Sequence, residues 1–171
     1  VGDLDADRQF DMLLTHFSGE PNTLYFNAPP FGFEDRTAAA GLVTTTFNST
    51  GFGVAMCDLD HDGDLDVAVA NGHVMRPGHR TAAAGKLWDS YAEPNQLFLN
   101  DGRGSLELAI DPQCPFRSRA FVSRGLAAAD VDGDGDLDLL VTNSAGPARL
   151  FYNEFPRSGN WIIVRAVEPA L

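Results

Sequence analysis

A nine-residue acidic loop, Asp-x-Asp-x-Asp-x-x-x-Asp, occurs three times in one frame and constrains this sequence more than any other feature. The three acidic loops occupy residues 3–11, 58–66 and 130–138. They hold more than half of the chain's 24 carboxylates, and the net charge is -12. Clustered carboxylates repel one another, so a fold that gathers them is expected to bind a divalent cation.

The segments around the loops repeat as well. Each loop is followed by a short apolar segment and then by an aromatic segment that ends in Asn. Two further sequence segments also recur. The aromatic segments are 22–27, 95–100 and 148–153; segments 51–57 and 123–129 precede the second and third loops; Gly-initiated segments 32–35 and 104–107 follow in the first two repeats. Short runs rich in β-branched and aromatic residues, bounded by Gly, Asn, Asp and Pro, are typical of strands in a meander.

These repeats predict an all-β fold of about three four-stranded, propeller-type blades, with an acidic loop between the first two strands of each blade. We expect blade 1 at residues 1–50, without its first strand, and blade 2 at 51–119, with an insertion at 72–94. Blade 3 and the start of a C-terminal segment take 120–171. Only the Ala-rich stretch 81–84 suggests a helix.

A propeller usually has at least four blades, so a chain with about three raises the question of how the ring closes. We expect either a fragment of a longer propeller or a chain that other chains complete. The sequence opens at Val1, inside a motif and without an initiator Met. It is therefore expected to be a mature or trimmed piece whose targeting segment is not shown.

Calcium fits the loop pattern, because it takes six to eight oxygen ligands at about 2.3–2.6 Å. Positions one, three, five and nine offer carboxylates, position seven offers its carbonyl, and a Gly at position six allows the left-handed turn that closes the loop. Two or three calcium ions are expected. The predicted ligands are Asp3, Asp5, Asp7, Gln9 and Asp11; Asp58, Asp60, Asp62, Asp64 and Asp66; and Asp130, Asp132, Asp134, Asp136 and Asp138.

The first loop departs from this pattern, because Arg8 replaces the Gly at position six. A non-Gly residue there costs on the order of 1 kcal/mol, and the added positive charge opposes ion binding, so this site is expected to be the weakest. The side chains of Asp64 and Asp136 are expected to face outward and to raise the local negative potential. An EF-hand is excluded, since position twelve carries no Glu and the flanks alternate like strands.

Two further interpretations of the loops differ in what the acidic groups do. Solvated Asp-Gly turns without an ion are disfavoured, because three copies share one frame and two have every ligand position filled. A bound ion is expected to have a structural role and no signalling role. It would stabilise its hairpin by removing carboxylate repulsion and by linking ion binding to folding.

With these residues in view, the chain resembles the FG-GAP or VCBS repeat family of calcium-binding propeller blades, through Phe52-Gly53 and the acidic loops. Residues 123–143 and 146–153, followed by 160–165, resemble the ASPIC/UnbV and cartilage acidic protein group more narrowly. In that group the Asn-Trp phrase opens a C-terminal module. The resemblance implies a secreted or surface location, calcium, and adhesion or ligand binding.

Other features leave alternatives open. Asn48-Ser-Thr is an N-glycosylation sequon. Cys57 and Cys114 form either one disulfide or two thiols, and no pair of closely spaced cysteines suggests zinc. The insertion either binds protein or glycan or packs on the next blade. Its candidate contact residues are His73, Arg76, His79, Arg80, Trp88 and Tyr91.

The function expected from the sequence is an extracellular or cell-surface calcium-binding module for adhesion, ligand binding or self-assembly into an array, without catalytic activity. Its partners would be a protein, a glycan or other copies of itself. The acidic balance argues against nucleic acid, and no segment reaches the length of a membrane helix. The alternative is a propeller portion of a polysaccharide-active enzyme, with His73, Arg76 and His79 as candidate catalytic residues.

Overall fold

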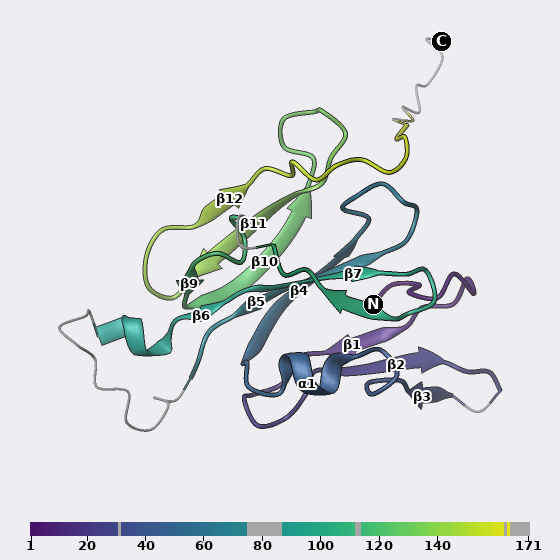
Figure 1. Ribbon diagram of the computed structural model, residues 1–171, viewed down its shortest axis with the longest axis horizontal. Coiled ribbons are helices and arrows are strands. Elements are labelled where there is room, and N and C mark those ends of the chain that lie inside the picture. The colour runs from purple at the N-terminus through teal and green to yellow at the C-terminus, as the bar shows by residue number, and fades with distance from the viewer. Residues whose placement is uncertain (31, 75–86, 112–113, 163, 165–171) are drawn as a thin grey trace, which may run out of the picture.

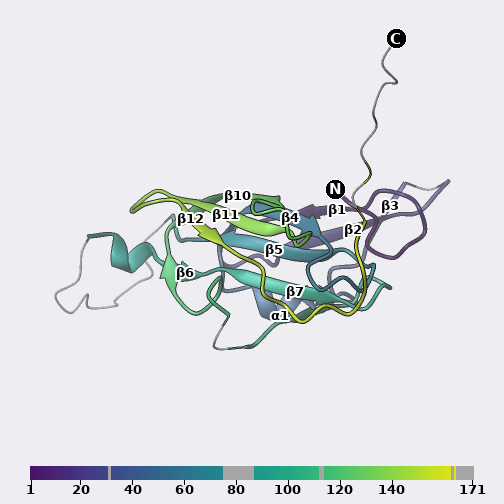
Figure 2. The ribbon, with the colours of Figure 1, turned by 90° about the horizontal axis from the view of Figure 1, so that it is seen from above.

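The structure is a computed structural model, and it describes residues 1–30, 32–74, 87–111, 114–162 and 164. Most of its regular elements are short antiparallel strands, which form several small sheets. Figures 1 and 2 show the sheet of blade 2 lying between those of blades 1 and 3. The prediction of a mainly β chain built from repeated antiparallel units is confirmed.

The sheet of blade 2 has four antiparallel strands in the order β4-β5-β7-β8. They are β4 (Gly51–Cys57), β5 (Asp66–Asn71), β7 (Gln96–Asn100) and β8 (Leu106–Leu108). Every residue of β5 is buried. Val67 and Val69 pack toward blade 1 and Ala68 packs toward blade 3, so this strand supplies both inter-blade cores.

The flanking sheets have three strands each in the described part of the chain. Blade 1 contains β1 (Met12–Leu14), β2 (Thr23–Asn27) and β3 (Phe33–Asp35); blade 3 contains β10 (Ser123–Ala129), β11 (Asp138–Asn143) and β12 (Arg149–Phe151). Before β1, Gly2 pairs with Asp11 in an isolated antiparallel bridge. The second and third acidic loops therefore join the first two strands of their sheets, and the first loop joins this bridge to β1.

The all-β prediction was wrong at two short helical segments, α1 (Leu42–Thr46) and the 3-10 helix η1 (Leu87–Tyr91). A five-residue helix is too short to show a periodic pattern, and α1 is held instead by burial of Leu42 and Thr46. The stretch 81–84 lies outside the described residues. A two-stranded ribbon pairs β6 (Glu93–Pro94) with β9 (Ala120–Phe121).

The acidic loops and the described ends of the insertion lie at opposite ends of the sheets. In Figure 1 the three loops lie at the right and top, whereas η1, β6 and β9 lie at the left. Two apolar cores hold the blades side by side. Leu4, Leu24, Phe26, Val67, Val69, Phe98 and Leu106 are buried between blades 1 and 2, and Cys57, Leu59, Ala68, Leu97, Phe116, Leu139 and Val141 between blades 2 and 3.

The Phe-Gly phrase explains how two neighbouring blades approach at β4 and β10. A Cβ atom on Gly53 would lie 2.6 Å from the backbone nitrogen of Leu126 and 2.9 Å from the carbonyl oxygen of Arg124. The guanidinium of Arg124 lies 4.0 Å from the centre of the Phe52 ring. The sequence places a residue without a side chain where the strands come closest, next to an aromatic ring that the neighbouring strand covers.

We predict that Gly53→Ala lowers the free energy of unfolding by about 1–3 kcal/mol, because backbone atoms of β10 must move to admit the methyl group. Denaturant unfolding in saturating calcium measures the change. Gly2→Ala is the matched control, since its Cβ would meet only side-chain atoms of Leu65 and Met56, which can shift more easily than backbone. Equal losses in the two variants would contradict this account of the Phe-Gly phrase.

Candidate metal centres

The three acidic loops share one backbone conformation. Positions four and six of each loop have a positive φ, the left-handed region that most residues avoid. The values are 61° and 71° for Ala6 and Arg8, 61° and 98° for His61 and Gly63, and 82° and 96° for Gly133 and Gly135. The left-handed turn at position six follows the prediction, including at Arg8. Position four was not anticipated, because only the third loop marks it with a Gly.

This backbone turns the Asp side chains of each loop toward a common centre. In every loop three carboxylates offer oxygen atoms that lie within 4.8 Å of one another. The triads are Asp3, Asp5 and Asp11; Asp58, Asp60 and Asp62; and Asp130, Asp132 and Asp138. Each triad could hold a metal ion. Positions one and three contribute in all three loops, and the third member comes from position five or nine.

The Asp at position one also fixes the turn of its own loop. One of its carboxylate oxygens accepts a hydrogen bond from the backbone N–H of position six in every copy. The donors are Arg8 at 2.8 Å from Asp3, Gly63 at 3.1 Å from Asp58, and Gly135 at 3.2 Å from Asp130. The left-handed turn thus aims a backbone donor at a carboxylate that also faces the candidate ion position.

The Asp at position nine is the most constrained acidic group in each loop. Asp11, Asp66 and Asp138 are all buried. Their Oδ2 atoms accept from position two of the loop: Leu4 at 2.8 Å, Leu59 at 2.9 Å and Val131 at 3.0 Å. Their Oδ1 atoms accept from the Asn that closes the aromatic segment: Asn27 at 3.1 Å, Asn100 at 3.0 Å and Asn153 at 2.9 Å. Position nine therefore ties the start of its loop to the third segment of its blade.

The side chains at positions five and seven make different contacts in the three loops, which the sequence does not indicate. Asp7 accepts hydrogen bonds from the backbone and side chain of Gln9. The expectation that Asp136 faces outward was wrong, since it is buried and its Oδ1 lies 2.8 Å from both Nε2 of His61 and Nε of Arg157. The hydrogen bond from Arg157 is the main cause that lowers the pKa of Asp136. Arg157 also contacts Asp134, so one cation binds two acids of the third loop.

Without an ion, the loops hold carboxylates in an unfavourable setting. Burial raises the pKa of Asp66 to about 6, although the N–H groups of Asn100 and Leu59 oppose this shift. Burial is also the main cause that raises the pKa of Asp5, Asp60 and Asp132, and neighbouring carboxylates add to it. A divalent cation would favour the ionised form of every one of these groups.

Comparison with known proteins identifies the repeats. The model of the FG-GAP-like repeat matches residues 3–69, which hold the first two loops, and 83–141, which hold the third. The chain belongs to the FG-GAP-like repeat family. It is 30% identical over 121 residues to cartilage acidic protein 1 of Xenopus tropicalis and 32% identical over 103 residues to that of Mus musculus. These matches cover 64% and 55% of this chain, and the expected relation to this group is confirmed.

The chain spans only 16% and 13% of the length of these two relatives, which are therefore much longer proteins. The two parts of the family match include all three acidic loops, and the second part ends at residue 141, just after the third loop. The part of the FG-GAP-like chain that carries the carboxylate triads is thus the part that the family shares. Residues 142–171 lie outside that match.

Several predicted residues lie outside the loops. Asn48 is exposed in the turn after α1, so its side chain is accessible, and its glycosylation stays a prediction. Cys57 and Cys114 are free thiols, both in or against the core between blades 2 and 3. No helix in the described ranges is long and apolar enough to cross a membrane.

The insertion is described only at its two ends. Arg76, His79 and Arg80 lie outside the described residues. Trp88 is 46% exposed and its ring centre lies 5.8 Å from that of Tyr91. Nε2 of His73 lies 3.0 Å from Oε1 of the buried Glu93, whose other oxygen accepts the backbone N–H of Thr50 at 3.0 Å. The candidate catalytic residue His73 is therefore paired with a carboxyl group that joins the insertion to the start of blade 2.

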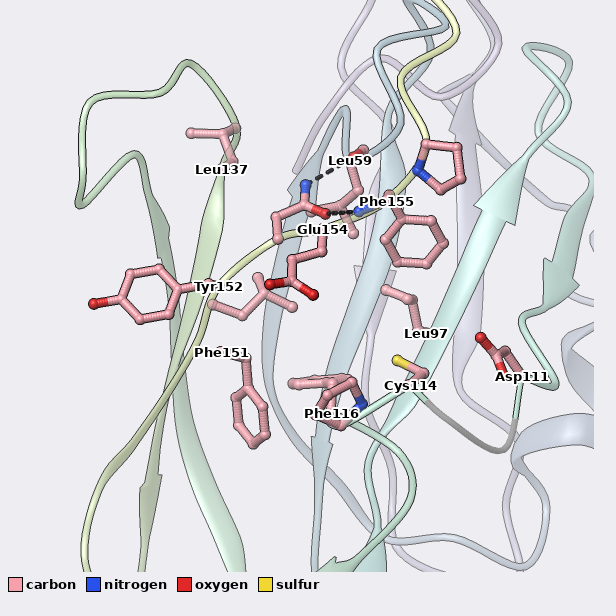
Figure 3. Close-up of a pocket in the computed structure, with 14 residues that line it drawn as sticks. Leu59, Leu97, Asp111, Cys114, Phe116, Leu137, Phe151, Tyr152, Glu154 and Phe155 are labelled. Carbon is pink, nitrogen blue, oxygen red and sulfur yellow. Dashed lines mark hydrogen bonds between the residues drawn. The ribbon is translucent and has the colours of Figure 1, made fainter.

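A cavity of about 320 Å³ lies between blades 2 and 3. Figure 3 shows Leu97 and Phe116 on one side of it and Phe151 and Leu137 on the other, with Glu154 among them. Most of its lining belongs to the inter-blade core, and it borders β12. We interpret it as a packing gap beside the last strand of the blade 3 sheet.

Glu93 predicts a pH dependence of stability. Burial raises its pKa from 4.5 to about 7. Because the folded-state value is the higher one, the carboxyl stabilises the fold at pH values below 4.5, and this contribution is lost as the pH rises through 7. Relative to Glu93→Gln in saturating calcium, the wild type should lose on the order of 2 kcal/mol between pH 4.5 and 7.5. A difference between the two that stays constant over this range would contradict the assignment.

The position of Arg8 in the first loop predicts which substitution strengthens calcium binding there. Arg8→Gly removes the left-handed strain and one positive charge, so calcium should bind the first site on the order of fivefold more tightly. Arg8→Gln removes the charge and keeps the strain, so it should recover only part of the gain. Calorimetric titration measures both, and no change in Arg8→Gly would show that position six does not limit this site.

Proposed function

We propose that this chain is a calcium-stabilised, non-catalytic propeller module of an extracellular protein, used for adhesion or ligand binding. The observation that carries the proposal is that three loops of one backbone conformation each bring three carboxylates to a common centre. A fold that repeats this arrangement three times holds a strongly repulsive set of charges in place, and bound cations remove that repulsion.

The donor set favours calcium over other metals. The triads offer only oxygen atoms, whereas zinc and most transition metals prefer nitrogen or sulfur ligands. The left-handed residues at positions four and six curl each loop around its carboxylates. Such a flexible set of oxygen atoms suits the six to eight irregularly arranged ligands of calcium better than the strict octahedron of magnesium. In this proposal positions one, three, five and nine bind through carboxylates and position seven through its carbonyl.

The role of the ion is structural. Positions one and nine already hold the turn and the neighbouring strand by hydrogen bonds, so an ion bound between them would lock a preformed hairpin. The extracellular location rests on the family and on similarity to cartilage acidic protein 1. Millimolar calcium outside cells is enough to fill even weak sites of this kind. A protein, a glycan or a further copy of the chain would be the partner.

The proposal of a non-catalytic module rests on what surrounds the candidate catalytic residue. His73 is bound to Glu93, and Glu93 is buried and holds the backbone of Thr50, so this pair connects segments of the fold. The side chain of Arg124 donates to the carbonyls of Gly72 and His73 and further fixes this corner. His73, Glu93 and Arg124 therefore each have a partner within the fold.

Calorimetric titration of calcium into chelator-treated protein tests the proposal. The wild type should bind two or three ions and gain thermal stability. The double variant Asp60→Asn, Asp132→Asn removes a position-three carboxylate from two loops and should lose two of them. Asp101→Asn is the control, since Asp101 is an exposed acid in the turn before β8 and outside every triad. No binding at millimolar calcium, or the same loss in Asp101→Asn, would sink the proposal.

A further inference from the structure

The Asp at position five of each acidic loop has one carboxylate oxygen with a constant partner and one without. Its Oδ1 accepts the backbone N–H of position seven in every loop. These bonds join Gln9 to Asp7 at 2.8 Å, Asp64 to Asp62 at 2.9 Å, and Asp136 to Asp134 at 3.0 Å. Any difference between the loops at position five therefore lies in what holds the second oxygen, Oδ2.

This second oxygen has a partner in the first and third loops. Oδ2 of Asp7 accepts a hydrogen bond from Nε2 of Gln9 at 3.0 Å. Oδ2 of Asp134 lies 3.3 Å from Nη2 of Arg157. In the second loop, no residue in the described part of the chain donates to Oδ2 of Asp62. The second loop thus leaves its position-five carboxylate free to turn.

The same difference appears in the carboxylate triads. Asp62 belongs to the triad of the second loop, whereas Asp7 and Asp134 lie outside the triads of the first and third loops. A position-five carboxylate therefore joins its triad where Oδ2 has no partner and stays outside where Oδ2 has one. Asp134 is still close to the centre of its loop. Burial is the main cause that raises the pKa of Asp132, and the charge of Asp134 adds to it.

Arg157 holds the third loop with a full positive charge and several bonds. Its Nε and Nη2 donate to Oδ2 of the buried Asp136 at 3.1 and 2.8 Å, and Nη2 also donates to the carbonyl of Asp134 at 3.1 Å. A positive charge this close to the carboxylates weakens the binding of any further cation to them. Gln9 in the first loop has no charge, so its effect on Asp7 is expected to be smaller.

Arg157 is fixed in place because it begins a segment, residues 157–161, that lies across the second and third loops (Figure 1). The backbone N–H of Ser158 donates to the carbonyl of Asp60 at 2.6 Å. A Cβ atom on Gly159 would clash with the carbonyl oxygen of His61, so the backbones approach closely there. The second loop thus helps to position the guanidinium that binds the third loop.

We propose that Arg157 lowers the calcium affinity of the third loop by competing with the ion for Asp134. In the ion-free loop Asp134 binds Arg157. In the loaded loop Asp134 turns to the ion, and Arg157 keeps only Asp136. The second loop, whose Asp62 has no such competitor, therefore fills at a lower calcium concentration than the third. This inference rests on the proposed function, because it takes the loops to be calcium sites.

Trp161 makes the third loop observable by itself, because its ring packs against position six, where a Cβ atom on Gly135 would clash with it. The chain has two tryptophans, so Trp88→Phe leaves Trp161 as the single one. In that background, calcium titration followed by tryptophan emission measures the midpoint for the third loop. Arg157→Gln should move this midpoint to a calcium concentration roughly three- to tenfold lower.

Arg119→Gln is the matched control for the lost charge. Arg119 is exposed and directly precedes β9, at the end of the sheets away from the loops, so its substitution should leave the midpoint unchanged. Arg157→Lys keeps the charge but cannot bind two acids in one fork, so its midpoint should lie between those of the wild type and Arg157→Gln. This milder variant also tests the proposal if Arg157→Gln fails to fold.

Thermal unfolding separates a competitor from a residue with only a structural role. In chelator, Arg157→Gln should lower the Tm, because the buried Asp136 loses its cation. The rise in Tm on adding calcium should nevertheless be larger than in the wild type. A structural role alone would lower the Tm and also weaken calcium binding, which would overturn the proposal.

A double-mutant cycle with Asp134→Asn tests whether the competition acts through this carboxylate. Arg157→Gln should tighten calcium binding less in the Asp134→Asn background than in the presence of Asp134. Equal gains in the two backgrounds would overturn the competition for Asp134, as would an unchanged midpoint in Arg157→Gln. Calorimetry that finds no bound calcium in the wild type would end the proposed function and this inference together. Bound calcium with an unchanged midpoint would end this inference alone.

Discussion

The buried carboxylate at position nine of each acidic loop is the interaction on which the rest of this structure depends. It accepts one N–H from the start of its loop and another from the Asn that ends the aromatic segment. These two bonds fix the loop, the strand after it and the third segment of the blade in one register. Removing the carboxylate would leave two donors unpaired beside the core, which costs more than the bonds themselves contribute.

The same arrangement creates an electrostatic conflict that runs through the chain. Carboxylates that must be ionised to bind a cation are gathered in each loop, and burial raises the pKa of Asp66 to about 6. Arg157 relieves this conflict for Asp136 with its positive charge, and Nε2 of His61 lies 2.8 Å from the same carboxylate. The triads have no such partner among the described residues, and bound calcium would take that place.

Neighbouring loops are also connected to each other. Asn100 holds Asp66 of its own loop with its backbone N–H and the first loop with its side chain, and Asn153 does the same for the third and second loops. An ion that orders one loop therefore stabilises an anchor point of the next. Calcium binding at one proposed site would therefore favour binding at the neighbouring site, because ordering the shared Asn stabilises both loops.

The acidic loops and their flanking strands were predictable from the sequence, because they depend on local residues that repeat along the chain. The Asp spacing predicts the loop and its left-handed position six, and the alternating segments predict the strands that flank it. The burial of Asp136 was not predictable, since Arg157 lies far along the chain and outside the repeat. The positive φ at position four was hidden because Ala6 and His61 adopt it without being typical of it. The short helix α1 depends on tertiary burial alone.

Hydrogen exchange with and without calcium tests the central claim most directly. The amides at positions two and six, and those of Asn27, Asn100 and Asn153, all donate to the loop carboxylates. If calcium locks a repeated hairpin, their exchange should slow together in all three loops when calcium is added, with the first loop requiring the highest concentration. Exchange rates that calcium leaves unchanged at these amides, while it binds elsewhere on the chain, would contradict the account.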